Sequence, residues 1–278
     1  METLKTIRFC AVAALVALTM TACSDDDDNP AAPDKELLVT KMEHNVKYVV
    51  EGYEDILFGA KDDISEMKYD GQGRLIEWVS NGECAGHYTY EKGKILLTDD
   101  PIHGSIEFHL NNKGQLSEAV YADGSVDKVS YNNKGQCVEV NQGGKFRTFY
   151  EWNGDNVVFM SFPDYEEEIP RIGLTITYSD IPKKSNAPYL RCMMANSSGY
   201  RLDMEIVGAL QISSEKYLPT KAVMEWEDGL QDIFEATYEL DPDGVVTVMH
   251  VIRSQRYDAS SEAFTVYTFD EEFTYQQK

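Results

Sequence analysis

The stretch of sequence that decides the fold is Tyr69-Asp70-Gly71-Gln72-Gly73-Arg74-Leu75. Its pattern, an apolar residue followed by Asn or Asp and then by Gly three places later, returns at residues 110–116, 131–137 and 240–246. Looser versions occupy residues 90–95 and 152–157. The first five turn glycines are spaced by 20, 21, 21 and 19 residues, and they are Gly73, Gly93, Gly114, Gly135 and Gly154. Self-similarity at such a period indicates an array of equivalent units.

Each of these glycines stands where a tight turn needs a positive φ, with Asn or Asp nearby for the same reason. A second set of turn signals lies between them: Asn81-Gly82, His103-Gly104, Asp123-Gly124, Gly143-Gly144 and Asp228-Gly229. One repeat is therefore expected to be two strands of about 8–10 residues joined by hairpins.

Apolar residues fall two apart before the main turns, as period-two alternation requires. The pairs are Met67 and Tyr69, Phe108 and Leu110, Val129 and Tyr131, and Tyr238 and Leu240. The alternate positions are polar, and on the predicted strands they include Lys68, Glu107, His109, Lys128 and Arg147. A membrane barrel needs apolar side chains on its outer face at membrane depth. We therefore expect an all-β antiparallel meander that curls into an open or closed barrel standing in water.

The pattern changes within residues 163–212. Residues 164–168 form a charged run, and Pro170, Pro182 and Pro188 interrupt the residues after it. Apolar residues at helical spacing in residues 202–212 favour a short helix packed on the sheet, with a strand as the alternative. We expect one β-repeat domain at residues 37–278, with an irregular insert at about 163–212 and at most one or two short helices near 188–212.

Residues 1–22 have the composition of a secretion signal. Lys5 and Arg8 form a short basic region, and residues 9–20 are apolar or small and uncharged. This combination, with small residues before the cleavage point, is typical of a secretory signal, and the apolar run is shorter than the ~20 residues of a transmembrane helix. The residues just before Cys23 resemble a bacterial lipobox, which implies that Cys23 carries the lipid.

An acidic run comes directly after the cysteine and consists of Ser24, Asp25, Asp26, Asp27 and Asp28. Like charges in a row, followed by Pro30, cannot join a packed core, so residues 23–36 are expected to form a flexible tether. The run resembles the acidic lipoprotein export signal of Bacteroidota, which implies display on the outer face of the outer membrane. A calcium site would need preorganised ligands, which a flexible run does not supply.

The net charge of the chain limits the kinds of partner that it is expected to bind. Removing residues 1–22 takes away Lys5, Arg8 and Glu2, which leaves 23 basic and 47 acidic residues and a net charge of −24. Such acidity argues against nucleic acid, whose phosphates require a basic surface. It also argues against electrostatic docking on anionic lipid, so membrane contact is expected only through the anchor on Cys23.

The chain resembles Bacteroidota lipoproteins assigned to a domain of unknown function with a porin-like fold. The resemblance covers about residues 37–275 and rests on the lipobox, the acidic run, the order of the glycine turns, and residues 178–180 and 218–221. The repeat unit is also similar to the tyrosine-aspartate repeats of secreted toxin shells. The family implies an antiparallel sheet curling towards a barrel, with no assigned activity and no functional residues to carry over.

Two motifs suggest metal binding, and each has a plainer interpretation. His103, Glu107 and His109 are zinc-ligand types on one face of a predicted strand, but positions six apart on a strand lie ~20 Å from each other. Solvated surface positions are therefore favoured. The sequence at residues 241–244 resembles the start of a calcium loop but lacks the downstream ligands, so a hairpin turn is favoured. No metal or cofactor is predicted.

The cysteines and aromatic residues also have candidate chemistry. Cys137 could act as a nucleophile, but Cys137 and Cys84 follow turn glycines by two residues, in positions otherwise held by apolar side chains, so both are expected to be buried. With Cys192, they allow at most one disulfide, and their spacing does not fit a metal site. Six aromatic residues could form a sugar-binding strip or pack in the core, and core packing is favoured. They are Tyr88, Tyr90, Tyr121, Tyr131, Tyr150 and Trp152.

Two functions remain open, and no catalytic residue is predicted. The first is a non-catalytic surface module that binds a glycan, a protein or an envelope component, or serves as an accessory subunit. The alternative is a carbohydrate-active hydrolase that uses paired carboxylates in a barrel mouth. Two carboxyl groups ~5–10 Å apart, one with a raised pKa, would favour the hydrolase. A filled interior would favour the binding module.

Overall fold

The computed structural model describes residues 37–51, 62–162, 172–194, 202–210, 216–226, 229–257 and 260–278. The predicted signal (1–22), Cys23, the acidic tether (23–36) and the charged run at 164–168 lie outside these residues. Lys35–Lys278 forms a compact unit by itself. Within the described ranges, no helix combines the length and the apolar character needed to cross a membrane.

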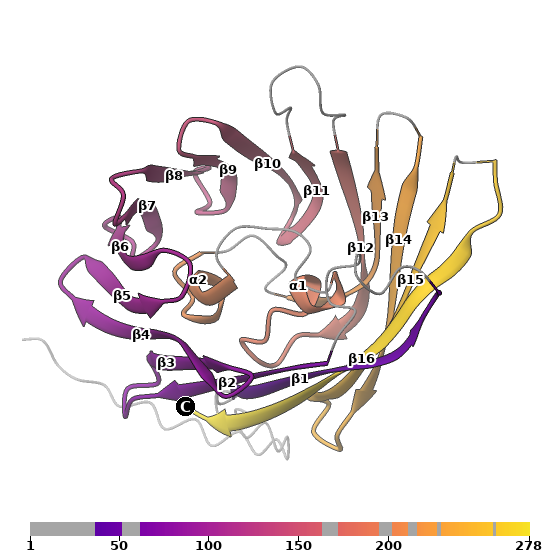
Figure 1. Cartoon of the computed structure of the whole chain (residues 1–278), viewed down its shortest axis with the longest axis horizontal. Helices are drawn as coiled ribbons and strands as arrows, with labels where there is room; N and C mark the ends of the chain where they lie inside the picture. Colours follow the sequence, from indigo (N-terminus) through magenta and orange to yellow (C-terminus); the bar gives the residue numbers. More distant parts are fainter. Residues whose placement is uncertain are drawn as a thin grey trace, which may run out of the picture. The chain divides into compact units, whose positions relative to one another are not determined.

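The described strands form one closed antiparallel barrel in which each strand pairs with its neighbours in sequence (Figure 1). The first eight are β1 (Leu37–Val49), β2 (Asp63–Tyr69), β3 (Leu75–Ser80), β4 (Glu83–Glu91), β5 (Lys94–Asp100), β6 (Gly104–Leu110), β7 (Leu116–Tyr121) and β8 (Val126–Tyr131). The other eight are β9 (Cys137–Gln142), β10 (Phe146–Asn153), β11 (Asn156–Phe162), β12 (Ile172–Pro182), β13 (Tyr217–Glu225), β14 (Gln231–Leu240), β15 (Val246–Arg256) and β16 (Phe264–Gln277). The predicted all-β meander is confirmed, and the barrel is closed.

Four of the predicted hairpin turns share one set of hydrogen bonds; they begin at Asp70, Asn111, Asn132 and Asp241. In each, Oδ1 of the first residue accepts hydrogen bonds from the backbone N–H groups two and four residues later, at 2.8–3.1 Å. Asp and Asn side chains favour such turns because they place an oxygen within reach of these N–H groups. The glycine three residues after the first residue of each turn has φ between 74° and 85°. The predicted positive φ at these glycines is confirmed.

The alternation of buried and exposed residues is confirmed over most of the wall. Met67, Phe108 and Val129 are buried and face the interior. Leu240 is an exception, since it is 41% exposed. It is the last residue of β14 and lies beyond a β-bulge that interrupts the register after Glu239. The same shift precedes Tyr69, Leu110 and Tyr131, which do pack against the core. The bulge therefore does not account for the exposure, and the prediction that Leu240 packs inward is wrong.

The irregular insert is shorter than expected. Strand β12 occupies residues 172–182, where prolines at both ends hide an ordinary alternation. Leu174 and Ile176 are buried, while Thr175 and Thr177 are exposed. Pro170 and Pro182 bracket this strand, and proline is tolerated at the ends of a strand. The true insert is the connection from β12 to β13.

This β12–β13 insert, residues 183–216, carries the two short helices, α1 (Tyr189–Met193) and α2 (Leu202–Ile206). Both lie inside the ring of strands (Figure 1). The buried residues of the insert and the inward residues of the wall belong to a single hydrophobic cluster. The expected short helix at 202–212 is confirmed, and it packs inside the barrel.

Polar contacts attach the insert to the wall. The Asn186 Oδ1 atom accepts from the Val39 backbone N–H at 2.7 Å, and the Asn186 N–H donates to the Leu37 carbonyl at 3.1 Å. Near the other end of the insert, the Leu116 N–H donates to the Ala209 carbonyl at 2.7 Å. Backbone groups of wall strands and insert thus satisfy one another, as buried polar groups must.

Candidate functional site

The three residues considered as zinc ligands are spread over the outer surface. His103 lies in the turn before β6, where its Nδ1 atom is 3.1 Å from Asp100 Oδ1. The His109 Nε2 atom is 3.7 Å from Glu107 Oε2, and all three side chains are more than 40% exposed. In the part of the chain that the structure describes, no group of three or more His, Cys, Asp or Glu residues is arranged to hold a metal ion.

Residues 241–244 form a hairpin turn, the interpretation that the sequence favoured over a calcium loop. Asp241 uses its Oδ1 atom to accept the N–H groups of Asp243 and Val245, both at 2.9 Å. The same arrangement is present in the turns at Asp70, Asn111 and Asn132, so the position has a structural explanation that requires no calcium ion.

The cysteines divide into two kinds. Cys137 is fully buried, and burial raises the pKa of its thiol, so the prediction that it is a core residue is confirmed. Cys192 is also buried, with a raised thiol pKa for the same reason. Cys84 is exposed, so the prediction that it is buried is wrong. An extra residue in β4, Ala85, forms a β-bulge opposite Trp78 and Val79 and moves Cys84 out of the inward alternation. All three thiols are free.

The aromatic residues belong mostly to the core, as favoured. Tyr88 and Tyr150 are buried, and the remaining four pack against the core cluster. Two of these are held by hydrogen bonds to the neighbouring hairpin: the Tyr131 hydroxyl donates to the Leu116 carbonyl, and Trp152 Nε1 donates to the Cys137 carbonyl, both at 2.7 Å. These rings therefore have structural partners within the wall.

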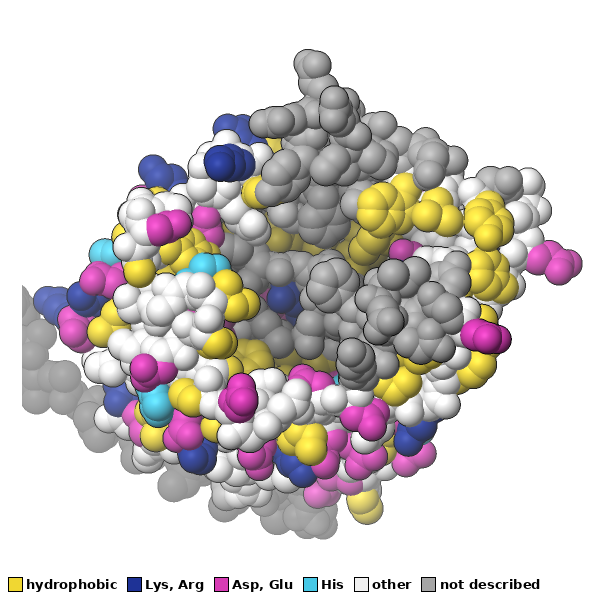
Figure 2. Space-filling view, viewed as in Figure 1, with side chains coloured by type: hydrophobic (Ala, Val, Ile, Leu, Met, Phe, Trp, Pro, Cys, Tyr) yellow, Lys and Arg dark blue, Asp and Glu magenta, His cyan; other side chains and the backbone are white. Residues whose placement is uncertain are grey.

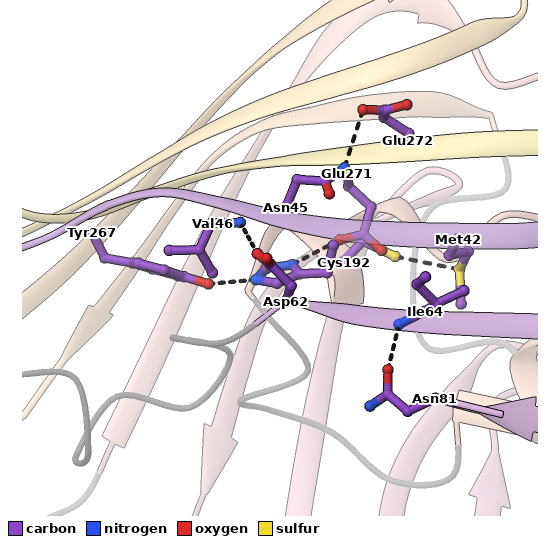
Figure 3. A network of polar contacts seen from close by, with 11 residues as sticks. Met42, Asn45, Val46, Asp62, Ile64, Asn81, Cys192, Tyr267, Glu271 and Glu272 are labelled. Carbon is purple, nitrogen blue, oxygen red and sulfur yellow. Dashed lines mark hydrogen bonds and ion pairs between the residues drawn. The ribbon is translucent and has the colours of Figure 1, made fainter. Parts of the chain in front are cut away.

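The main group of buried polar side chains on the inner wall was not found from the sequence. It joins His44 of β1 to Tyr267 and Glu271 of β16, and Figure 3 shows Tyr267 and Glu271 within this network. The His44 Nδ1 atom lies 2.9 Å from Glu271 Oε2, and its Nε2 atom contacts the Tyr267 hydroxyl. All three residues are less than 8% exposed. We call them the seam triad, because β1 and β16 are the first and last strands and their pairing closes the barrel.

The alternation of the two strands contains the signal that could have located the seam triad. Met42 and His44 share a face of β1, and Phe269, Glu271 and Phe273 share a face of β16. A histidine and a glutamate in inward positions of apolar strands must be paired, because burying an unpaired charge is costly. The missing information was the register, which places His44 opposite Glu271.

The electrostatics of the seam triad depend on its burial. Desolvation raises the pKa of Glu271 above its usual value, and the hydrogen bond and charge of His44 oppose that shift. Burial also raises the pKa of Tyr267, which keeps its hydroxyl protonated. The Nδ1 atom of His44 faces Glu271, and its Nε2 atom faces the Tyr267 hydroxyl. Both imidazole nitrogens are thereby used within the triad.

A second polar group lies on the inner face of β14 and β15. Arg253 Nη2 is 3.0 Å from Asp232 Oδ2, and Gln255 Nε2 donates to Asp232 Oδ1 at 2.8 Å. The Arg253 guanidinium also lies 5.2 Å from the centre of the Phe234 ring, a cation–π contact. The buried carboxylate of Asp232 is therefore compensated by both charge and hydrogen bonds.

The insert carries its own buried charges. Arg191 of α1 and Glu205 of α2 approach to 3.9 Å, and both side chains are less than 8% exposed. The Tyr88 hydroxyl of the wall donates to Asp203 of α2 at 3.1 Å. These contacts join α1 to α2 and α2 to β4, so the polar groups of the interior hold the insert in place.

The interior offers limited support for paired-carboxylate chemistry. Glu271 is a carboxyl group with a raised pKa, as a general acid requires, but its hydrogen-bond partner is the imidazole of His44. A retaining or inverting glycosidase needs a second carboxyl facing the first across the substrate. Here the group that contacts Glu271 is the imidazole of His44, and the charge of Asp63 contributes only the smallest of the causes that shift its pKa. The insert helices pack against the wall in the same hydrophobic cluster.

The sequence matches no family model and no curated protein. Two solved structures share the barrel. A porin-like protein from Bacteroides uniformis ATCC 8492 aligns with a TM-score of 0.59 at 17% identity, over 86% of this chain and 98% of that chain. A porin-like protein from Bacteroides vulgatus ATCC 8482 aligns with a TM-score of 0.56 at 14% identity, over 87% of this chain and 99% of that chain. At these identities the likeness shows the fold alone, and it confirms the predicted porin-like barrel.

Proposed function

We propose that this chain is a lipid-anchored, surface-exposed outer-membrane protein. Its barrel is a non-catalytic binding or accessory module for a glycan, a protein or an envelope component. The observation that carries the proposal is the packing of the insert: its helices lie inside the ring of strands, and their buried residues form one hydrophobic cluster with the inward wall residues. The rims and the outer face are therefore the surfaces offered to partners.

The outer surface supports a barrel that stands in water. Cross-strand ion pairs join neighbouring strands on that face, including Lys68–Glu77 and Lys221–Glu235 at 2.9 Å. Figure 2 shows acidic and basic side chains spread over the visible surface. Charges at membrane depth would destabilise a lipid-facing wall by ~2–4 kcal/mol for each Lys or Arg. Contact with the membrane is therefore assigned to the anchor.

The anchor and the tether complete the proposal. Cys23 carries the lipid, and Ser24 to Asp28 provide the export signal that directs the protein to the cell surface. The tether, residues 23–36, spans at most about 50 Å when fully extended. This length would let the barrel stand clear of the lipid headgroups and reach partners in the envelope.

Cell fractionation tests the anchor. We expect Cys23→Ala to move the protein from the membrane fraction to the soluble fraction with the barrel still folded, because stable anchoring requires acyl chains. Retention of the variant in the membrane would overturn the lipoprotein assignment. Protease added to intact cells tests display: wild type should be digested, and replacing Asp25 to Asp28 by alanine should protect it. Protection of the wild type would place the barrel on the periplasmic side.

A pull-down from envelope extract, run beside a glycan array, tests the binding function. The bait is residues 36–278, with the same chain unfolded in urea and refolded on the resin as a recovery control. We expect reproducible capture of one class of ligand without turnover of it. Hydrolysis of an array glycan that is abolished by Glu271→Gln would instead favour the carbohydrate-active hydrolase.

A further inference from the structure

Three side chains with complementary chemistry meet on the outer face of β4 and β5, away from the insert and the seam triad. The Cys84 sulfur lies 3.6 Å from Nδ1 of His87, and the same nitrogen lies 3.0 Å from Oδ2 of Asp99. Cys84 is exposed, and the side chains of His87 and Asp99 are 50% and 66% exposed. We call these residues the rim triad.

A β-bulge brings the thiol to this face. Residues 84 and 87 are an odd number apart, so regular alternation would place them on opposite faces of β4. The register runs from His87 opposite Glu77 to Cys84 opposite Val79, and Ala85 is the extra residue. The neighbouring Gly86 is required here, because a Cβ atom would lie 2.3 Å from Leu97 Cδ1. Bulges re-aim side chains in this way and are frequent beside active sites.

A second backbone irregularity brings the carboxylate of Asp99 to the same outer face. Asp99 follows Leu97 by two residues on β5, and Leu97 is fully buried, so alternation would point Asp99 inward. Asp99 instead has φ of 62°, one of two described non-glycine residues with a positive φ. The ladder between β5 and β6 is interrupted at the same point. Non-glycine residues in this conformation are uncommon and strained, and they concentrate at functional sites.

We propose that the rim triad is a reactive-thiol site, at which Cys84 forms a mixed disulfide with a low-molecular-weight disulfide. The Cys84 thiol gives its proton to Nδ1 of His87, and the sulfur attacks one sulfur of the incoming disulfide. The S–S bond of that molecule breaks, a new S–S bond forms to Cys84, and the leaving thiolate takes the proton from His87. Once Nδ1 carries the proton, it donates to Oδ2 of Asp99, which lies 3.0 Å away; Asp99 is a positioning residue whose carboxylate balances the charge of the imidazolium.

Cys84 differs in exposure from the two other cysteines that the structure describes. Cys137 and Cys192 are 0% and 2% exposed, and burial raises the pKa of both. A thiolate is the attacking species in disulfide exchange, and access sets its rate. Exchange in the folded protein is therefore assigned to Cys84 among these three.

Peptide mass mapping after incubation with glutathione disulfide tests the proposal. The full chain is purified in detergent and treated at pH 7 while folded, and the rate of adduct formation is measured at each cysteine peptide. We expect an adduct at Cys84 and none at Cys137 or Cys192. His87→Gln should slow the reaction of Cys84 by at least about tenfold, because a positioned proton acceptor contributes roughly 10²–10⁴-fold. Asp99→Asn should slow it by a smaller factor.

His103→Gln is the matched control, since His103 is another exposed histidine that contacts an aspartate, in the next turn along the chain. It should leave the rate at Cys84 unchanged. Equal rates for wild type and His87→Gln, with both folded by circular dichroism, would overturn the proposal and reduce Cys84 to an ordinary exposed thiol.

Discussion

The wall from β2 to β11 and the seam between β1 and β16 are two parts of one sheet, but they are stabilised differently. In the wall, each strand meets the next through a short turn, and the decisive contacts join residues two to four apart, as at Asn111 and Asn132. At the seam, the partners His44 and Glu271 are 227 residues apart in sequence. Each turn contact in the wall closes a short loop of chain, whereas the contact at the seam closes a loop of 227 residues.

The difference has an energetic consequence. Short hairpins order few residues before they gain a hydrogen bond, so the entropic cost of each is small. The seam must join the two ends of the barrel, and it does so with a buried polar triad in addition to its ladder. A buried polar group specifies its register strongly, because any slip leaves a charge unpaired. We therefore expect mutations at the seam to have larger effects than mutations in the wall.

The largest effect should come from His44→Ala. The change removes the partner that Glu271 and Tyr267 share, and breaking a buried pair in this way typically costs ~3–5 kcal/mol. Urea unfolding of residues 36–278 measures the loss. Asn45→Ala is the control, because Asn45 donates to Glu272 on the exposed side of the same seam. A control loss as large as that of His44→Ala would show that the seam is held by its ladder alone.

Next in size should be Gly135→Val in the wall. Gly135 has φ of 85°, which a β-branched residue does not tolerate, and strained backbone of this kind costs about 1–3 kcal/mol. The side-chain amide of Gln115 also donates to the Gly135 carbonyl at 2.6 Å. Gly71→Val is the control, since Gly71 has no positive φ and no atom within 4 Å of its added Cβ. Equal melting temperatures of the two variants would contradict the assignment of the turn.

A smaller loss is expected for Cys137→Ser. The change puts a hydroxyl into a fully buried position. The Glu139 carbonyl, which the Cys137 thiol contacts at 3.8 Å, can accept from it in part, so the cost should lie at the low end of the about 1–3 kcal/mol of an unsatisfied buried polar group. Cys84→Ser places the same hydroxyl on the exposed rim and should be neutral for stability. Thermal melts of the two variants compare a core and a surface position with identical chemistry, and melts that coincide would refute the core assignment of Cys137.

The smallest effect is a pH dependence at the seam. Because the folded pKa of Glu271 is raised, the folded protein binds its proton more tightly than the unfolded chain does. This group therefore stabilises the fold at low pH, and its contribution falls as the pH rises above the ordinary value of 4.5. Glu271→Gln removes this contribution, so the variant should gain stability relative to wild type from pH 4.5 upwards. Parallel stability curves in urea would contradict the raised pKa.

The sequence was a good guide wherever the cause of a structure is local. Gly73 and Asn111 stand in turns whose hydrogen bonds lie within five residues, so their roles could be predicted from neighbouring side chains. Cys84 was placed on the wrong face, because a bulge depends on the partner strand and leaves no clear mark in a single sequence. The strand β12 was missed for a related reason, since the prolines at its ends hid its alternation.

The sequence by itself determined the strands other than β12, their hairpins and the identity of the residues at the turns, because turn chemistry and period-two alternation act over a few residues. Only the tertiary structure decided that the barrel closes, that the helices of the β12–β13 insert pack inside it, and that His44 meets Glu271 and Cys84 meets His87. Those contacts depend on register and curvature summed over sixteen strands. An error of one residue in that sum turns every inward side chain outward, so no local pattern could specify them.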